Sequence, residues 1–538
     1  MKKTLLSAIL VVVSTSVMAV PAKRGAFVRT AADGTEKTVY LNGDEHFHYI
    51  TDAEGNWLDE ETLTPIPAEI KAARQEAGEA RVAAAREMQR QRAQVRRAKQ
   101  ETGLTPLLSP RGAVILVSYK DKAFKSTNAQ MTDWAMGDNY TYNGATGSIH
   151  KYFYDQSWGA YDLQIDVYGP VKVSQKLSYY GKNDSNGDDQ HPDELVKEAC
   201  ILAHDSCGAD FSQYDFDGDG KVDWVVILYA GYGEASGAAA NTIWPHQWEL
   251  SYSDMAFDLD GKTIDHYCCL NELTGTSGSR RDGIGTFCHE FSHVMGLPDL
   301  YATTDNATHR TMVDWDIMDY GPYNNDGNTP PNYSAYEKWF MGWITPTLVN
   351  SEASVIMPPL EDCRAAVLLT DSGVNVEDVL NPNPKKYYLL ENRKQEGWDA
   401  YLPGEGLMIT KINYNASRWV QNTVNNYSSS MGVDILEAKK NSNTYEGAAT
   451  DLYPAGSTTF TTVKKFPVTN IALEDGIITF DVCGGGDTIE LKYEAPQGIE
   501  EIVERVGEKT MKVLHNGQVL IIRNGVVYDL NGRMTTAL

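Results

Sequence analysis

The pattern of apolar and polar positions predicts a mixed α/β domain in the middle of the chain. Continuous apolar runs at residues 113–117 and 222–229 are rich in β-branched side chains, which is typical of buried strands. Helices are expected at residues 148–157 and 193–204, the second introduced by a proline. Because strands and helices mix over this stretch, we expect one α/β or α+β domain at residues 106–350.

Beyond residue 350 the helical pattern thins out and strand-like runs take over. Residues 386–390 and 477–482 are separated by Gly, Pro and Asn clusters, which favours a β-sandwich domain at residues 351–484. Three glycines then mark a linker, and Asn-Gly turn signals predict a small β module within residues 485–538. Its strands resemble the C-terminal sorting modules of the type IX secretion pathway, so type IX-like secretion machinery is an expected partner. The sequence therefore predicts a multidomain protein.

The first 19 residues have the pattern of a secretory signal peptide. Two lysines precede an apolar run at residues 5–13 and a small-residue cleavage site that ends at Ala19. The run is too short to span a bilayer, which takes about 20 apolar residues, and no other stretch of the sequence reaches that length. An N-terminal core helix is the alternative. We therefore expect no transmembrane segment and a protein that is secreted or held at the cell surface.

Residues 20–105 are expected to form a propeptide. Short apolar runs and turn residues at 23–64 predict a small β unit, and the alanine-rich, proline-free residues 67–100 predict a long basic helix. The segment ends in an exposed basic stretch from Arg90 to Arg111 that proteases could cut. A plain linker is the alternative for this stretch.

Charge and composition exclude some classes of function. The chain of 538 residues has a formal net charge of -26, which argues against a general nucleic-acid or anionic-membrane binder. Residues 1–111 hold 16 basic and 14 acidic side chains, so the acidic excess lies in the remainder, on which the basic helix could dock. Seven cysteines, all after residue 111, leave at least one thiol unpaired and are too few for a disulfide framework.

The most informative stretch is the run HEFSHVMGLPD. On a helix, His289 and His293 share a face and can aim imidazole nitrogens at one Zn²⁺, while Glu290 lies beside the open coordination position. Gly296 suits the left-handed conformation that ends a helix, so the chain can double back and bring the carboxylate of Asp299 as a third ligand. The alternative is a core helix whose histidines are merely hydrogen-bonded.

The motif and its surroundings resemble a known group of peptidases. The pattern HExxHxxGxxD, followed by DIMDYG at residues 316–321, resembles the metzincin clan, in which a methionine turn lies beneath the zinc. The sequence HEFSHVMGLPDLY resembles that of the immune inhibitor A-like (M6) family. The same holds for the runs DGDGKVDWVVILYAGYGE, TIWPH, SAYEKW, LLENR and LPGEGL. The resemblance covers roughly residues 112–415. It implies a secreted endopeptidase with a propeptide, a metzincin-like catalytic domain and β-rich C-terminal parts. Family members often carry His-x-Asp where this chain has Lys-Ile-Asn at residues 411–413.

A mechanism follows from these residue types. Zinc lowers the pKa of a bound water to about 7, and Glu290 is expected to accept its proton as the general base. The resemblance implies that Tyr320 donates a hydrogen bond to the developing oxyanion; a packing aromatic is the alternative. Met318 is expected as a hydrophobic floor under the imidazoles rather than a ligand.

A second cation site is expected at the loop DFDGDGKVD. It places Asp215, Asp217, Asp219, Lys221 and Asp223 at positions 1, 3, 5, 7 and 9, with Gly at position 6, as in the start of an EF-hand. Position 12 is a valine inside an apolar run, so the bidentate glutamate of an EF-hand is missing. The loop predicts a single Ca²⁺ that supports the following strand. An acidic, solvated turn is the alternative.

The leading functional hypothesis is a secreted zinc endopeptidase that cleaves proteins or peptides. Two alternatives are a surface adhesin or binding protein on a metalloprotease-like scaffold, and another zinc amide hydrolase that acts on cell-wall material. The propeptide is expected to inhibit the enzyme until it is removed. A cysteine switch is excluded because the first cysteine is Cys200, so a carboxylate or imidazole from residues 44–48 (DEHFH) is the candidate latency group, with a surface turn as the alternative.

Overall fold

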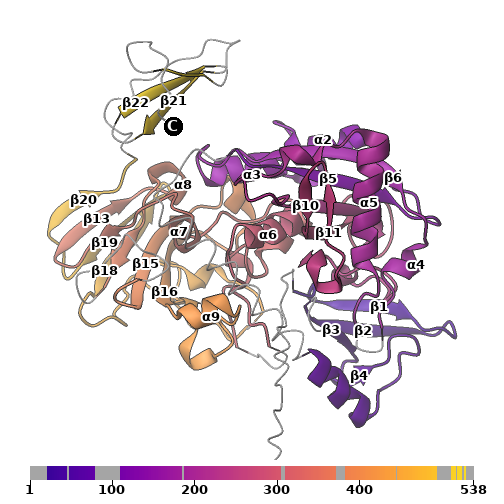
Figure 1. Cartoon of the computed structure of the whole chain (residues 1–538). Coiled ribbons are helices and arrows are strands. Elements are labelled where there is room, and N and C mark those ends of the chain that lie inside the picture. The colour runs from indigo at the N-terminus through magenta and orange to yellow at the C-terminus, as the bar shows by residue number, and fades with distance from the viewer. Residues whose placement is uncertain are drawn as a thin grey trace, which may run out of the picture. The chain divides into compact units, whose positions relative to one another are not determined.

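The computed structural model describes residues 21–44, 48–78, 109–184, 187–304, 309–370, 382–443 and 445–493, together with the strand residues 510–515, 518–523 and 526–528. The expected signal peptide, and the expected long helix and basic stretch beyond residue 78, lie outside these residues. The chain divides into two compact units, Met1–Lys492 and Tyr493–Leu538, and each is described by itself (Figure 1). Among the described helices, none is both long and apolar enough to cross a membrane.

A five-stranded sheet forms the centre of the first unit. Its strands, in spatial order, are β6 (Gln164–Lys172), β5 (Arg111–Ser118), β7 (Val225–Tyr232), β11 (His266–Leu273) and β8 (His246–Glu249). The first four run parallel, and β8 joins β11 antiparallel. Residues 113–117 and 225–230 are fully buried, as expected for strands that are covered on both faces. The strand prediction from the apolar runs is therefore confirmed.

Helices cover this sheet and begin with clear sequence signals. The longer ones are α2 (Asn128–Met136), α3 (Ile149–Gln156), α5 (Pro192–Cys207) and α6 (Gly285–Val294); the short α4 (Leu177–Tyr180) precedes α5, and the short α7 (Ala335–Phe340) follows α6. Helix α3 is capped by the Ser148 hydroxyl, which accepts a hydrogen bond from the Lys151 amide at 3.2 Å. Pro192 occupies the first turn of α5, where no N–H partner is needed. The mixed α/β architecture predicted from the sequence is confirmed, and the strands β9 (Phe257–Leu259) and β10 (Lys262–Ile264) add a small hairpin.

The N-terminal segment forms its own antiparallel sheet. It consists of β1 (Ala26–Thr30), β2 (Glu36–Gly43), β3 (His48–Thr51) and β4 (Trp57–Leu58), and residues 68–78 are helical. Val39, Leu41 and Ile50 from this sheet share a hydrophobic cluster with Ala235 and Trp244 of the central domain. The small sheet therefore completes its core only against the central domain.

Two further sheets follow the central domain and pack face to face. One contains β12 (Thr347–Leu348), β14 (Val367–Leu369), β15 (Lys386–Arg393), β16 (Gly406–Asn413) and β17 (Val433–Ile435); the other contains β18 (Val468–Glu474), β19 (Ile477–Val482), β13 (Ala353–Met357) and β20 (Asp487–Glu490). Side chains alternate along the strands of the first sheet. Leu407 and Ile409 enter the core between the two sheets, whereas Met408 joins the large core of the central domain. The first sheet is therefore shared between two cores.

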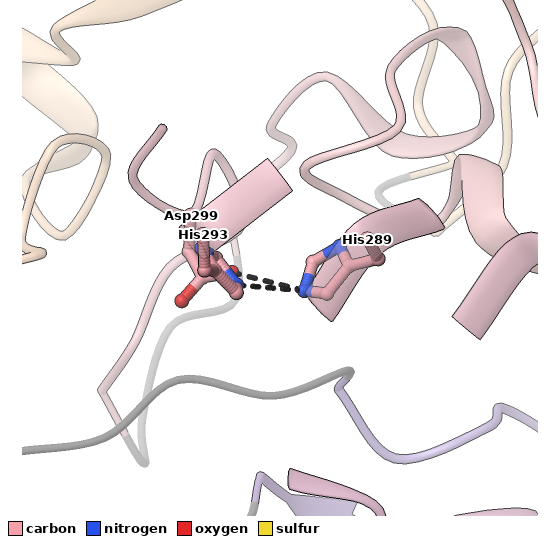
Figure 2. Close-up of side chains that lie close together, drawn as sticks. All are labelled: His289, His293 and Asp299. Atoms are coloured by element: carbon pink, nitrogen blue, oxygen red, sulfur yellow. Dashed lines mark hydrogen bonds and ion pairs between the residues drawn. The ribbon is translucent and has the colours of Figure 1, made fainter. Parts of the chain in front are cut away.

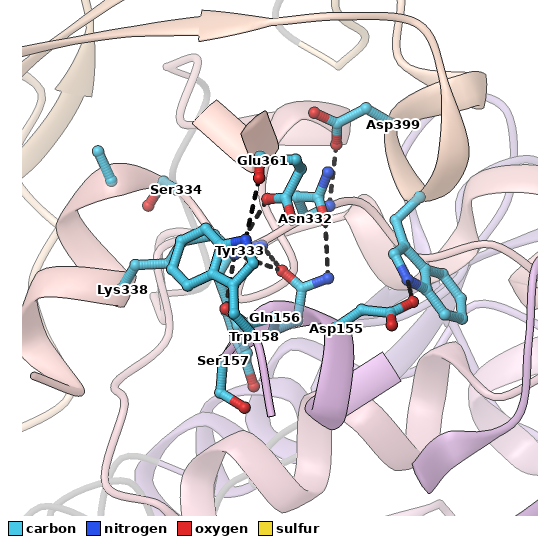
Figure 3. A network of polar contacts seen from close by, with 12 residues as sticks. Asp155, Gln156, Ser157, Trp158, Asn332, Tyr333, Ser334, Lys338, Glu361 and Asp399 are labelled. Carbon is cyan, nitrogen blue, oxygen red and sulfur yellow. Dashed lines mark hydrogen bonds and ion pairs between the residues drawn. The ribbon is translucent and has the colours of Figure 1, made fainter. Parts of the chain in front are cut away.

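A buried polar network also joins the central domain to the β-rich region (Figure 3). The Asp399 carboxylate accepts a hydrogen bond from the Asn332 amide at 2.9 Å, and the Lys338 ammonium group lies 3.0 Å from Glu361. The Gln156 side chain donates to the Asn332 side chain at 2.7 Å. Because all of these groups except the half-buried Glu361 are buried, the two regions are fixed against each other by polar contacts as well as by apolar packing. The short helices α8 (Leu360–Cys363) and α9 (Ala416–Val420) lie in the connections of this region.

The second unit is a small antiparallel meander. It consists of β21 (Thr510–His515), β22 (Gln518–Arg523) and β23 (Val526–Tyr528). These strands agree with the small β module that the Asn-Gly turn signals predict, for the residues that the structure describes.

Candidate metal centre

Helix α6 carries the HExxH motif through the core of the central domain. Its first residue, Gly285, has no room for a side chain, because a Cβ there would lie 2.0 Å from the Pro322 carbonyl oxygen. Phe291 packs edge-on against Trp224, with ring centroids 5.0 Å apart, and this contact helps to fix the rotation of the helix. The histidines are one turn apart on the helix. Gly296 takes a positive φ of 94°, and the chain reverses there as the sequence predicts.

The three predicted zinc ligands converge, as Figure 2 shows. The Nε2 atoms of His289 and His293 lie 3.1 Å apart, and each lies 3.3 Å from Oδ1 of Asp299. All three side chains are buried. A tetrahedral ion with bonds of about 2.0–2.1 Å has ligand-to-ligand edges of about 3.3 Å, which matches this triangle.

Hydrogen bonds on the far side of each imidazole fix its tautomer. His289 Nδ1 donates to the Ile317 carbonyl and His293 Nδ1 donates to the Leu297 carbonyl, each at 2.8 Å. A carbonyl can only accept, so each Nδ1 carries the proton and each Nε2 presents a lone pair. No hydrogen-bond donor among the described residues reaches Oδ1 of Asp299. Three acceptors therefore face one another in a buried space. A divalent cation between them stabilises this arrangement, whereas without a cation the three acceptors repel one another.

The protonation states agree with a metal site. Burial lowers the pKa of His293 below its ordinary value, which favours the neutral, metal-binding form. Burial alone would raise the pKa of Asp299, but in the absence of a metal the positive charge of a protonated His293 or His289 holds that pKa below its ordinary range. A neutral histidine and an ionised aspartate are the forms that bind zinc.

The methionine turn supports the site through its backbone. Met318 is fully buried, and its amide donates to Oδ1 of Asp316 at 2.8 Å. Its carbonyl accepts from the Leu300 amide at 2.7 Å, directly after the third ligand. The adjacent Ile317 carbonyl is the group that orients His289. One contact between this turn and the predicted ligands is therefore a backbone carbonyl.

Glu290 lies close to Tyr323, one of the two tyrosines that follow the methionine turn. Glu290 is buried on α6 between the two histidines. Burial raises the pKa of Tyr323 well above its ordinary value, with further contributions from Tyr320 and from the Glu290 charge. The phenol of Tyr323 and the Glu290 carboxylate are therefore electrostatic neighbours. The ring of Tyr320, however, is covered by the Arg24 guanidinium group, 3.3 Å from its centroid.

The predicted latency residues separate in the structure. His48 stacks on Trp244, with ring centroids 4.3 Å apart, and its Nε2 lies 3.6 Å from the Glu234 carboxylate. It joins Glu60 and Glu234 in a cluster distinct from the predicted zinc ligands. Asp44 is buried, and its charge raises the pKa of Tyr320 alongside the larger effect of burial. Residues 45–47 lie outside the described residues.

Three of the five predicted calcium residues come together. Ligand atoms of the Asp215, Asp217 and Asp219 side chains lie within 4.8 Å of one another, whereas the Asp223 side chain is not part of this group. Asp223 instead accepts a hydrogen bond from the Phe216 amide at 2.6 Å.

A lysine also reaches into this loop. The ammonium group of Lys262 lies 2.6 Å from Asp215, and this contact lowers the pKa of that carboxyl. A protein cation therefore already contacts one of the three carboxylates.

Comparison with known proteins identifies the central domain. Residues 116–344 match the model of the immune inhibitor A peptidase M6 catalytic domain. This segment is therefore similar to the catalytic domain of the M6 peptidases. Its end at residue 344 lies directly before β12, so the β-rich region is outside the matched segment. The resemblance to this family that the sequence indicated is therefore confirmed for residues 116–344.

Curated relatives share this domain at modest identity. The chain is 29% identical to immune inhibitor A of Bacillus thuringiensis subsp. alesti over 216 residues, which is 36% of the chain and 31% of that protein. It is 27% identical to the pre-pro-metalloprotease PrtV of Vibrio cholerae over 246 residues, 41% of the chain and 25% of that protein. It is 22% identical over 332 residues to a protein of Arthroderma benhamiae named as a secreted metallopeptidase, covering 49% of the chain and 47% of that protein. The matched parts thus span less than half the length of each relative.

Sequence reasoning missed one residue that touches the ligands. Asn422 lies 123 positions after Asp299 and forms hydrogen bonds to it. An isolated asparagine in a polar loop gives no sequence signal for such a contact.

Proposed function

We propose that the chain is a secreted, zinc-dependent endopeptidase that hydrolyses protein or peptide bonds with Glu290 as the general base. The observation that carries this proposal is the triangle of His289, His293 and Asp299, whose three facing acceptor atoms need a cation between them. The M6 match and relatives named as metalloproteases support the class of reaction. Zinc is the ion that best suits two imidazoles and one carboxylate in a tetrahedral arrangement.

The chain's own residues supply binding and proton transfer. When bound, zinc acts as a Lewis acid and makes water nucleophilic at neutral pH. His289, His293 and Asp299 would hold the ion. The Glu290 carboxylate accepts a proton from the attacking water and returns it to the leaving amine. Burial strengthens this exchange, because few waters compete for the carboxylate.

Tyr320 is proposed to donate a hydrogen bond to the developing oxyanion. Burial raises the pKa of its phenol, so the hydroxyl keeps its proton near neutral pH and stays a donor. The position directly after the methionine turn supports this role. In the chain as described, the Arg24 guanidinium group covers the ring.

Residues 20–105 are proposed to be an inhibitory propeptide. Several contacts of the N-terminal segment with the catalytic face support this: the Tyr323 hydroxyl donates to the Pro21 carbonyl at 2.7 Å, and the Lys23 amide donates to the Ala235 carbonyl at 2.9 Å. Arg29 adds a buried ion pair with Glu234 at 3.5 Å. Asp44 stays the candidate latency group of the predicted pentapeptide, because its charge reaches Tyr320. Cleavage between Arg90 and Arg111 would then release the segment.

Export and a second metal complete the proposal. A signal peptide at residues 1–19 and type IX-like sorting through residues 485–538 are proposed to carry the protein out of the cell. The names of two relatives, a pre-pro-metalloprotease and a secreted metallopeptidase, support an extracellular location. Ca²⁺ is proposed to bind at Asp215, Asp217 and Asp219, which lie together.

A substrate comparison separates this function from its alternatives. The matured chain is assayed on casein and on purified cell-wall material, with and without a zinc chelator. We expect casein hydrolysis that the chelator abolishes. Chelator-sensitive release from cell-wall material alone would instead favour an amide hydrolase, and no hydrolysis of either substrate would favour a binding protein. The intact set of ligands and Glu290 argues for the enzyme.

A further inference from the structure

The loop at residues 422–426 of the β-rich region holds the segment that carries the third metal ligand. This loop connects α9 to β17. The side-chain carbonyl of Asn422 accepts a hydrogen bond from the Asp299 amide at 2.7 Å. The Asn422 side-chain amide donates to Oδ2 of Asp299. The Asn422 side chain therefore forms hydrogen bonds to both the backbone and the carboxylate of Asp299.

Neighbouring residues extend the contact along the same segment. Asn425 donates to the Leu300 carbonyl at 2.7 Å, and the side chain of Asn426 accepts from the Thr303 amide at 2.9 Å. The Thr303 hydroxyl donates to the Asn422 carbonyl at 2.6 Å. We call residues 422–426 the asparagine clamp. It forms hydrogen bonds to three residues of the segment that carries the ligand: Asp299, Leu300 and Thr303.

The clamp is itself fixed by the β-rich region. Asn425 accepts from the Val433 amide at 3.0 Å and donates to its carbonyl at 2.8 Å, which ties the loop to β17. Val424 is buried in the large core. Asn422 has a positive φ of 47°, a conformation that asparagine tolerates better than most residues. Its orientation is therefore set before a metal binds.

The two oxygens of Asp299 have different partners. Oδ1 faces the two imidazole Nε2 atoms at 3.3 Å, whereas Oδ2 is occupied by the Asn422 amide. A donor on Oδ2 leaves one oxygen for the metal and holds the carboxylate plane toward the histidines. Partners that orient a ligand in this way commonly change metal affinity by about 10- to 100-fold when they are removed.

We propose that Asn422 is a positioning residue for Asp299, so that the zinc site is completed by the β-rich region, outside the family-matched residues 116–344. This inference rests on the proposed metal site. The catalytic domain and the β-rich region then form one functional unit, joined at the third ligand.

The test compares two buried asparagines in the full chain. Asn422→Gly removes both hydrogen bonds without straining the positive φ. The matched control is Asn392→Ala, since Asn392 is also buried and donates to the Met357 and Gly476 carbonyls at 2.9 and 2.8 Å, but contacts neither metal ligand nor clamp. Zinc affinity is measured by competition with a chromophoric chelator, and the melting temperature is measured with and without zinc.

We expect Asn422→Gly to bind zinc about 10- to 100-fold more weakly and to show a smaller zinc-induced rise in melting temperature. Asn392→Ala should melt earlier but keep the wild-type zinc affinity. Should Asn422→Gly fail to fold, Thr303→Val removes only the two hydrogen bonds that the hydroxyl donates to Asn422 and Asn426, and it should still weaken zinc binding. Wild-type affinity in the folded Asn422 or Thr303 variant would overturn the inference. A wild-type chain that takes up no zinc would instead overturn the proposed function.

Discussion

The guanidinium group of Arg24 lies 3.3 Å from the centre of the Tyr320 ring and 5.0 Å from that of Tyr445. Arg24 belongs to the N-terminal segment, whereas Tyr320 follows the methionine turn of the catalytic domain. The positive charge opposes the larger effect of burial, which raises the pKa of Tyr320. The proposed propeptide therefore contacts a proposed catalytic side chain directly, through a cation–π interaction.

Arg24→Ala should weaken latency. We expect the uncut chain that begins at residue 20 to be nearly inactive, and the variant to be about 2- to 30-fold more active before any cleavage, as for the loss of a contact worth about 0.5–2 kcal/mol. Peptide hydrolysis before and after limited trypsin treatment measures this. Lys23→Ala is the control, because its solvent-accessible pair with Asp326, at 3.8 Å, and its contact with the Tyr323 ring, at 5.9 Å from the centroid, are both long and contribute little. Full activity of the uncut wild-type chain would show that the segment is not an inhibitor.

The third ligand can be tested against a neighbouring buried aspartate. Asp299→Asn replaces a charged ligand by a neutral amide and should lower zinc affinity strongly. Asp316→Asn should retain zinc, since burial raises the pKa of Asp316 toward a neutral form and its contact is with the Met318 amide. Metal content after dialysis distinguishes the two. Equal retention of zinc by both variants would place the third ligand elsewhere.

Calcium should raise the melting temperature of the wild-type chain, because binding to the folded state alone stabilises it. Replacing Asp217 and Asp219 together by Asn should abolish the shift. Lys262→Gln should enlarge it, since the ammonium group that now contacts Asp215 at 2.6 Å no longer competes with the ion. Thermal denaturation with calcium or with a calcium chelator measures these shifts. A wild-type melting temperature that does not change with calcium would show that this loop does not bind the ion.

Glu391 should make stability depend on pH. Burial raises its pKa to about 7 in the folded chain, well above the value of about 4.3 in an unfolded one. The folded state therefore holds this proton more tightly. The stabilisation that this proton contributes to the folded state is complete below about pH 4.3. It is lost as the pH rises through 7, with a slope in the free energy of unfolding of at most about 1.4 kcal/mol per pH unit.

Glu391→Gln carries no such proton and should lose less stability than the wild type between pH 5 and pH 8. The amide can still accept the hydrogen bond that the Ala335 amide now donates at 2.6 Å. Urea denaturation at the two pH values gives the comparison. Parallel pH profiles of variant and wild type would contradict the assignment.

Local chemistry made much of the metal centre predictable. The spacing of His289 and His293, the glycine that reverses the chain and the position of Asp299 all act within one short segment, and the structure has each of them as expected. The central strands were also predictable, because a buried parallel strand needs a continuous apolar run.

Contacts between distant segments were not predictable in the same way. The partnership of Asn422 with Asp299, and that of Arg24 with Tyr320, depends on how separate elements pack, and neither polar residue carries a pattern. The predicted calcium loop was predictable only in part. Its spacing brought three carboxylates together, but no local pattern indicated that Lys262 would contact one of them.

The most direct test of the account measures zinc content and peptide hydrolysis together, in the trypsin-matured wild type and in Glu290→Gln. Glutamine keeps the size of the buried side chain but cannot accept the proton. The account predicts one zinc per chain in both proteins, and hydrolysis that is about 10²- to 10⁴-fold slower in the variant. Near-normal hydrolysis by Glu290→Gln, or hydrolysis by a wild-type chain that holds no zinc, would contradict it.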